Sequence, residues 1–225
     1  MGICISSASA EIHQEKDGLE NAMYLEDNFV KSGYICTRAG SKGLNQDAAV
    51  LHQSYGTQLG SFCAVFDGHG KNGHVVSKIV RDRLASLVLE QKDILEKTQK
   101  VAKTKDERIN GDIEHVGEDF HNWKAAFVGA FKVMDKEIKL QENLDCTCSG
   151  TTAVAVIRQG GDLVIANLGD SRALLVTIND NGLLPVQLTT DLKPSVKGEA
   201  ERIKKCNGRV FALETEPHIQ RVWLP

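Results

Sequence analysis

The spacing of apolar and polar positions changes along the chain, and each change predicts a different kind of secondary structure. Apolar residues occur in short runs at 48–51 and 61–66, which is typical of strands buried in a sheet. At 76–88 and again at 120–138 they recur every three or four residues, which predicts two amphipathic helices, the second with an aromatic stripe in the core. From 151 to 177 they alternate with polar residues, which predicts further strands.

These elements follow one another in the order strands, helices, strands. The predicted strands are 33–38, 48–51, 61–66, 151–158, 162–167, 172–177 and 209–213. The predicted helices are 76–88, 120–138 and a short one that begins near Pro194 and ends at Asn207-Gly208, with a polar loop at 97–118. Tight turns between consecutive strands favour antiparallel pairing. We expect an α+β fold in which helices cover an antiparallel sheet.

Composition narrows the class of protein. The 225 residues, 41% of them hydrophobic and 25% charged, are typical of one soluble globular domain, or one and a part. With 27 basic and 30 acidic residues, and no basic stripe interleaved with aromatic residues, a nucleic-acid partner is not expected. No apolar run has transmembrane length, and no signal peptide is present. Six scattered cysteines without a C-x-x-C pair indicate reduced thiols and a cytoplasmic protein.

The first residues match a lipidation pattern. Met1-Gly2-Ile3-Cys4-Ile5-Ser6 fits N-myristoylation at Gly2, and Cys4 supplies a candidate palmitoylation site. Because one acyl chain anchors a protein only marginally, two chains would be needed for stable attachment to the cytoplasmic face of the plasma membrane. The alternative is a chance match. We expect residues 1–32 to be a flexible leader with this candidate lipid anchor, and residues 33–225 to form the fold.

The candidate chemistry is concentrated between Ser61 and Gly73. A buried strand runs directly into Asp67-Gly68-His69-Gly70, where the glycines allow a sharp turn and close approach to a ligand. The structural alternative is a strand-to-helix turn with a polar corner, since aspartate and glycine are ordinary turn residues.

A second acid, Asp47, stands at the start of the preceding strand. If the two strands pair antiparallel, the carboxylates of Asp47 and Asp67 lie at the same edge of the sheet. Hard divalent cations such as Mg²⁺ and Mn²⁺ prefer oxygen ligands, and two of them can hold a phosphate for hydrolysis. A nearby imidazole such as that of His69 could protonate the leaving alkoxide. Two lone aspartates at strand ends are also common as purely structural residues.

Six segments in one order resemble the metal-dependent protein phosphatases of the type 2C family, most closely its plant members. They are N-Q-D-A at 45–48, V-F-D-G-H-G at 65–70, S-G-T-T-A-V at 149–154, I-A-N-L-G-D-S-R-A at 165–173, L-T-T-D-L-K-P at 188–194 and E-A-E-R-I at 199–203. The resemblance implies an αββα four-layer fold, an antiparallel β-sandwich flanked by helices. It also implies a signalling hydrolase that removes phosphate from phosphoserine and phosphothreonine in a phosphoprotein substrate, and we expect a monomer.

The resemblance also implies roles for individual residues. Asp47 and Asp67 correspond to ligands of two Mn²⁺ or Mg²⁺ ions, and Gly68 to a ligand through its backbone carbonyl. His69 corresponds to the proposed general acid. Asp170, in G-D-S-R, belongs to a family segment but is not a metal ligand there, and it is expected to be a turn residue.

The chain departs from the family pattern at several positions. The phosphate-binding arginine is replaced by Lys42, which binds phosphate as a point charge without a bidentate fork. A glutamate is replaced by Gln46, which removes a negative charge, and Asp145 lies at a different offset from the acid expected near S-G-T-T.

The family's later metal carboxylates, in a D-G-hydrophobic-W-D segment and an Asp-Asn pair, have no counterpart before Pro225. The expectation is therefore the N-terminal portion of a type 2C domain, with the C-terminal part missing. Two functions remain open for this chain: a metal-dependent phosphatase, or a catalytically impaired form that acts as a binding or competing module.

Overall fold

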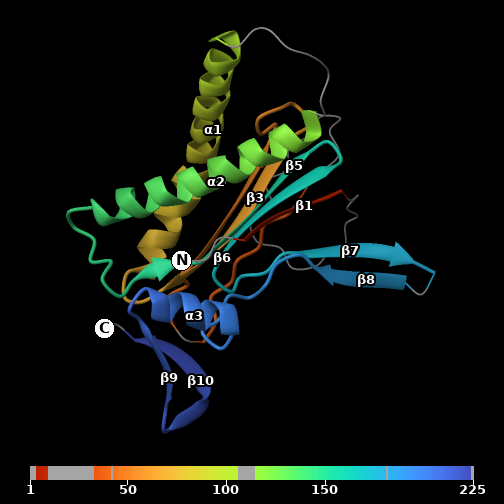
Figure 1. Ribbon diagram of the computed structural model, residues 1–225. Coiled ribbons are helices and arrows are strands. Elements are labelled where there is room, and N and C mark those ends of the chain that lie inside the picture. Colours follow the sequence, from red (N-terminus) through yellow and green to blue (C-terminus); the bar gives the residue numbers. More distant parts are fainter. Residues whose placement is uncertain (1–3, 10–32, 42, 106–114, 181, 224–225) are drawn as a thin grey trace.

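The computed structural model describes residues 4–9, 33–41, 43–105, 115–180 and 182–223 (Figure 1). Two long helices lie on one face of an antiparallel sheet, and the later part of the chain forms two separate two-stranded sheets and a short helix. The α+β class and the antiparallel pairing predicted from the sequence are therefore confirmed.

The main sheet has every neighbouring pair of strands antiparallel. Its strands in spatial order are β1 (Cys4–Ser9), β6 (Asp162–Leu168), β5 (Ala153–Gln159), β3 (Ser61–His69) and β2 (Asp47–Gln53), and β4 (Gly150–Thr151) pairs with the end of β3. The β3 strand lies between β5 and β2 and extends through Asp67-Gly68-His69, three residues beyond the strand predicted from the sequence.

The core lies between this sheet and the helices α1 (Gly73–Lys105) and α2 (His115–Lys139). Side chains of β3 alternate across the sheet, so Phe62 and Phe66 are buried under the helices, whereas Cys63 and Val65 face the other way. The aromatic stripe of α2 faces the same core through Trp123 and Phe127, as its spacing predicted.

The helices are longer than the sequence analysis predicted. The segment 97–118 was expected to be a loop, but α1 continues to Lys105 and α2 begins at His115, so that prediction is wrong for those residues. A polar face does not end a helix when the opposite face is held by a neighbour. Here the amide of Gln99 donates to Asn122 Oδ1 at 2.8 Å, which joins α1 to α2 beyond the apolar contacts.

The segments before β2 also differ from expectation. Residues 33–38 were predicted to form a strand, but the structure has no regular secondary structure there. Side chains make contacts in place of a strand ladder: Asn45 Nδ2 donates to Thr37 Oγ1 at 2.8 Å, and Leu51 packs against Gly33.

The predicted flexible leader is wrong for residues 4–9, which form β1 along the edge of β6, with Cys4 opposite Asn167. An edge strand presents unpaired backbone groups, and a second extended segment can pair with them whatever its side chains. Gly2 and the rest of the leader, residues 10–32, lie outside the described residues.

The later part of the chain forms two ribbons. The first is β7 (Leu174–Asn179) with β8 (Gly182–Gln187); the second is β9 (Arg209–Leu213) with β10 (Glu216–Trp223), preceded by α3 (Lys197–Lys205). The strands β8 and β10 were not predicted. The end of α3 was predicted correctly, because Asn207, which follows the helix, adopts a left-handed conformation (φ 64°). Within the described residues, the expected four-layer sandwich is represented by one wide sheet and one layer of long helices.

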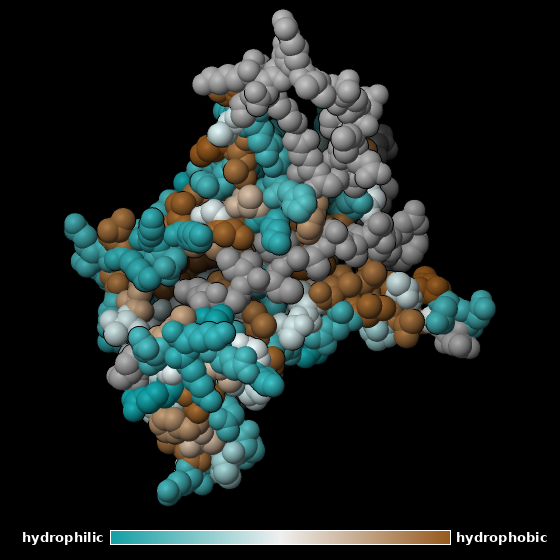
Figure 2. All heavy atoms as spheres, viewed as in Figure 1, coloured by the Kyte–Doolittle hydropathy of each residue, from teal (hydrophilic) through white to brown (hydrophobic). Residues whose placement is uncertain are grey.

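The β7–β8 ribbon carries apolar side chains that nothing in the described part of the chain covers well. Ile178 and Leu183 are each 66% exposed, and Leu184 and Val186 face outward on the other side of the ribbon. Figure 2 shows apolar side chains along this projecting ribbon. Two-stranded ribbons of this kind are marginally stable by themselves.

Candidate active site

The two acids singled out in the sequence stand directly opposite each other. β2 and β3 pair in antiparallel register with Asp47 opposite Asp67. Their neighbours Ala48 and Phe66 are buried beneath α1, so both carboxylates project from the face of the sheet that lies away from the helices. The prediction that both acids lie at one edge of the sheet is confirmed.

Negative charge is concentrated at Asp67. Partial burial raises the pKa of its carboxyl group above the ordinary value, and the charges of Asp47 and Asp170 and a hydrogen bond with Asp47 raise it further. The nearby His69 acts in the opposite direction. A cation placed between the acids would relieve this repulsion, because opposite charge favours the ionised form.

The backbone around Gly68 is packed too closely for a side chain. A Cβ there would lie 2.4 Å from the carbonyl oxygen of Gly73 and 2.6 Å from that of Gln46. The chain then turns at Gly70, which has φ +79° and would bring a Cβ within 2.1 Å of the Cys148 carbonyl oxygen. These glycines bring the end of β3, the start of β2 and the start of α1 together.

His69 is the last residue of β3. It follows Asp67 by two positions and therefore lies on the same face of the sheet. It pairs with Gly150 of β4. A Cβ at Gly150 would stand 3.0 Å from both Cε1 and Nε2 of the imidazole, so the ring lies against this glycine. The structure therefore brings His69 and the two acids to one sheet edge.

Gln46 connects the start of β2 to β3 and α1. Its backbone carbonyl accepts hydrogen bonds from Gly68 N at 3.2 Å and from Ser77 Oγ at 2.6 Å. Its side-chain Oε1 is buried without a hydrogen-bond partner in the described structure. Both Gln46 Oε1 and the carbonyl carbon of Gly68 lie within 3 Å of the place where a Cβ on Gly73 would stand. Gln46 therefore adds an uncompensated oxygen beside the Gly68 carbonyl.

The donors at this edge fit a hard divalent cation by chemistry. They are oxygens: the carboxylates of Asp47 and Asp67, the Gly68 carbonyl and the amide oxygen of Gln46. In the residues that the structure describes, no group of three or more His, Cys, Asp or Glu side chains lies close enough to hold a metal. Two facing carboxylates balance the charge of one divalent ion, and a second ion would need further acidic ligands.

The sequence analysis missed two hydroxyl residues at this site, and it predicted only a turn position for Asp170. Thr152 Oγ1 accepts the backbone N–H of Asp67 at 2.9 Å, and it lies 2.6 Å from Ser171 Oγ. The turn that carries Ser171 also brings Asp170 near enough to raise the pKa of Asp67. The available signal was the position of these residues inside S-G-T-T-A-V and G-D-S-R, since hydroxyl residues in such turns commonly bond backbone groups.

Other predicted residues are placed elsewhere or not described. Lys42 and Gly2 lie outside the described residues, and Cys4 is placed only by the backbone of β1. Asp145 is engaged in its own loop: its carboxylate accepts the N–H of Thr147 at 3.0 Å, and this lowers its pKa. Among the helices that the structure describes, none is both long and apolar enough for a membrane span.

The fold and this oxygen-rich sheet edge define an α+β protein with a candidate cation-binding site. Comparison with known families matches residues 36–222 to the family described as Protein phosphatase 2C. The chain is 46% identical to Probable protein phosphatase 2C 72 of Arabidopsis thaliana and 42% identical to Probable protein phosphatase 2C 12 of Oryza sativa subsp. japonica. The chain therefore belongs to the protein phosphatase 2C family, and the plant-like resemblance is confirmed.

The matches cover all of this chain but 67% and 66% of those two relatives, so the chain spans about two thirds of their length. Among solved structures, the fold is similar to the serine-threonine phosphatase 2C from Toxoplasma gondii, with a TM-score of 0.63 and 24% identity over 81% of this chain and 57% of that one. A C. elegans sex determining protein matches with a TM-score of 0.54. These structural likenesses concern the fold.

Proposed function

We propose that this chain is a metal-dependent protein serine/threonine phosphatase that hydrolyses phosphoserine and phosphothreonine in proteins. The observation that carries the proposal is the register of β2 and β3, which sets Asp47 opposite Asp67 with Gly68 and His69 immediately after. Membership of the protein phosphatase 2C family supports the reaction class.

In this proposal, Asp47, Asp67 and the Gly68 carbonyl hold Mn²⁺ or Mg²⁺. When bound, such ions neutralise phosphate oxygens and lower the pKa of a coordinated water. His69, on the same sheet face, donates a proton to the leaving alkoxide of the serine or threonine. Lys42 contributes a positive charge for the incoming phosphate.

The proposal includes two ions and a complete αββα sandwich. Two divalent ions carry four positive charges, and the facing pair of aspartates supplies two negative ones. Additional carboxylates and strands would then come from polypeptide equivalent to the third of the relatives' length that this chain does not match. The exposed apolar ribbon β7–β8 is a surface on which such strands would pack.

A second candidate function follows from the same ribbon. A form with an incomplete cation site and exposed apolar strands would bind partners or substrates of a full-length enzyme without turning them over.

We also propose a cytoplasmic monomer with peripheral attachment at the plasma membrane, through acylation of Gly2 and Cys4. Mass spectrometry of protein from a eukaryotic host tests this attachment. An unmodified Gly2 would remove it.

The test of function is hydrolysis of a phosphothreonine peptide by the folded 225-residue chain, with Mn²⁺ and with chelator. Turnover that requires Mn²⁺ and is lost in Asp67→Asn would support the phosphatase. The control Asp93→Asn removes an exposed acid from α1 and should retain activity. A folded, soluble chain that is inactive with Mn²⁺ would favour the binding module instead.

A further inference from the structure

The strand ladder changes its hydrogen-bonding pattern at Asp67. The β3–β5 ladder reaches Val65 opposite Val154, and the β3–β4 ladder resumes with Gly68 opposite Thr151. The same register places Asp67 opposite Thr152. In an antiparallel ladder, two such residues can exchange two backbone hydrogen bonds.

Only one of these two backbone bonds forms. Thr152 N donates to the Asp67 carbonyl at 2.9 Å, but Asp67 N donates to the Thr152 hydroxyl, also at 2.9 Å. The Thr152 carbonyl instead accepts from Thr151 Oγ1 at 3.0 Å. A side-chain hydroxyl thus takes the place of a ladder carbonyl at the residue that carries the site carboxylate.

This hydroxyl is itself held by another part of the chain. Thr152 Oγ1 lies 2.6 Å from Ser171 Oγ, in the turn after β6. A methyl group of Thr152 also packs on this turn, where a Cβ at Gly169 would stand 2.8 Å from Thr152 Cγ2. Hydrogen bonds in such chains strengthen one another, so Ser171 affects how firmly Thr152 holds Asp67.

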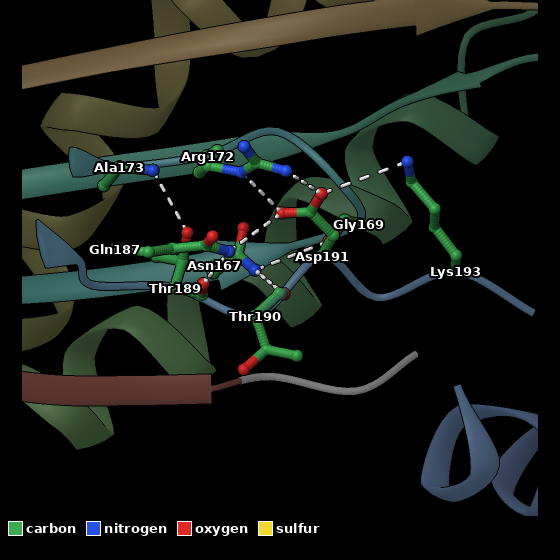
Figure 3. Close-up of polar contacts among 9 residues, drawn as sticks. All are labelled: Asn167, Gly169, Arg172, Ala173, Gln187, Thr189, Thr190, Asp191 and Lys193. Carbon is green, nitrogen blue, oxygen red and sulfur yellow. Dashed lines mark hydrogen bonds and ion pairs between the residues drawn. The ribbon is translucent and has the colours of Figure 1, made fainter. Parts of the chain in front are cut away.

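The turn is fixed from its other side by the segment 187–193 (Figure 3). Arg172 donates two hydrogen bonds to the Asp191 carboxylate, at 3.0 and 2.6 Å. Leu192 N donates to the Gly169 carbonyl at 2.9 Å, and Asn167 Nδ2 donates to the Thr190 carbonyl at 2.9 Å. Bidentate arginine–carboxylate pairs are geometrically specific, so this pair orients the turn.

We propose that Thr152 and Ser171 are positioning residues for Asp67, and that the Arg172–Asp191 pair holds the turn from which they act. The inference rests on the proposed function for its catalytic meaning, but the positioning itself is a property of the folded chain. The role of G-D-S-R and L-T-T-D-L-K-P in this network is to aim the Asp67 carboxylate.

The experiment is amide hydrogen exchange measured by NMR on the full 225-residue chain in chelator. In Thr152→Val, the Asp67 amide should exchange roughly five- to tenfold faster, because its acceptor is lost. Thr152→Ser should restore the wild-type rate, since it keeps the hydroxyl. Ser171→Ala should accelerate the Asp67 amide by about two- to fivefold. The amide of Ala64 in the same strand should be unchanged in all three.

Two control variants remove the same kinds of side chain at positions away from Asp67. Thr98→Val removes a hydroxyl that bonds a helix carbonyl in α1, and Arg83→Gln removes an arginine that bonds Glu90 on the same helix. Neither should change exchange at Asp67, whereas Arg172→Gln should. If Thr152→Val does not fold, Ser171→Ala decides the outcome.

An unchanged Asp67 rate in Ser171→Ala, or equal acceleration of Asp67 and Ala64, would overturn the proposal. Broadening of the Asp67 signal by added Mn²⁺ is recorded on the same samples. Wild-type protein without broadening would contradict the proposed cation site and leave the exchange result to decide the positioning.

Discussion

Replacing Asp47 with asparagine should distinguish two effects of the acidic pair: the destabilisation of the fold by repulsion between the two carboxylates, and the stabilisation gained when the pair binds a cation. Asp47 and Asp67 face each other across β2 and β3, and Asp47 is one of the causes that raise the pKa of Asp67. Asparagine has nearly the same shape, carries no charge and can donate a hydrogen bond to the remaining carboxylate. In chelator, we expect Asp47→Asn to be more stable than the wild type.

The magnitude follows from the geometry. Like charges directly opposite on neighbouring strands destabilise by about 0.2–1 kcal/mol, and the exposure of both side chains keeps the value in that range. A cation at 100 times its Kd would stabilise the wild type by about 2.7 kcal/mol. The variant should lose most of this gain, so the order of stabilities should reverse between chelator and saturating Mn²⁺.

The sign of the pH dependence follows from the raised pKa of Asp67. A carboxyl group with a higher pKa in the folded state than in the unfolded state binds more protons when folded, so stability falls as pH rises between the two values. In chelator, this fall should be present in the wild type and smaller in Asp47→Asn. Burial and Asp170 still raise the pKa of Asp67 in the variant.

The assay is urea unfolding monitored by tryptophan fluorescence, in EDTA and in Mn²⁺, at several pH values from 4 to 8. Asp93→Asn serves as the control for loss of an exposed acid. Lower stability of Asp47→Asn than of the wild type in EDTA would refute the repulsion argument. Equal stabilisation of both proteins by Mn²⁺ would refute the cation site at this pair.

Three further predictions concern the fold. Gly70→Ala should destabilise by more than about 2 kcal/mol in urea unfolding, because the left-handed φ and the Cys148 carbonyl leave no place for a Cβ, and a neutral result would contradict this turn. Phe127→Ala should cost about 3–5 kcal/mol in the same assay, since the ring is fully buried between α2 and the sheet. The double variant Ile178→Lys with Leu183→Lys should reduce aggregation measured by light scattering and should keep the helical circular dichroism signal. Unchanged aggregation would mean that the exposed apolar side chains of the β7–β8 ribbon do not cause self-association.

The placement of the two acids was predictable because β2 and β3 are consecutive strands joined by a short turn. Once the two strands are located, antiparallel pairing alone brings Asp47 near Asp67. The buried face of β3 and the core stripe of α2 were predictable for a similar reason, since side-chain periodicity depends only on local backbone geometry. Glycine and asparagine likewise mark turns such as the one after α3, where Asn207 adopts a left-handed conformation.

Ends of elements and unusual pairings were not predictable in this way. The polar stretch 97–105 is helical because α2 supports it, and residues 4–9 form a strand because β6 offers an open edge. The strands β8 and β10 lie in stretches to which the sequence analysis assigned no element. They are strands because they pair with β7 and β9.

The sequence by itself determined the family, the order of most elements, and the residue types that can supply oxygen ligands and a proton donor. The tertiary structure decided how these residues are held. The Asp67 amide bonds a hydroxyl 85 residues further along the chain, and the turn bearing Ser171 is held by Asp191 through Arg172. Such contacts join segments whose separation in sequence carries no periodic signal, and they exist only because the packed sheet brings those segments together.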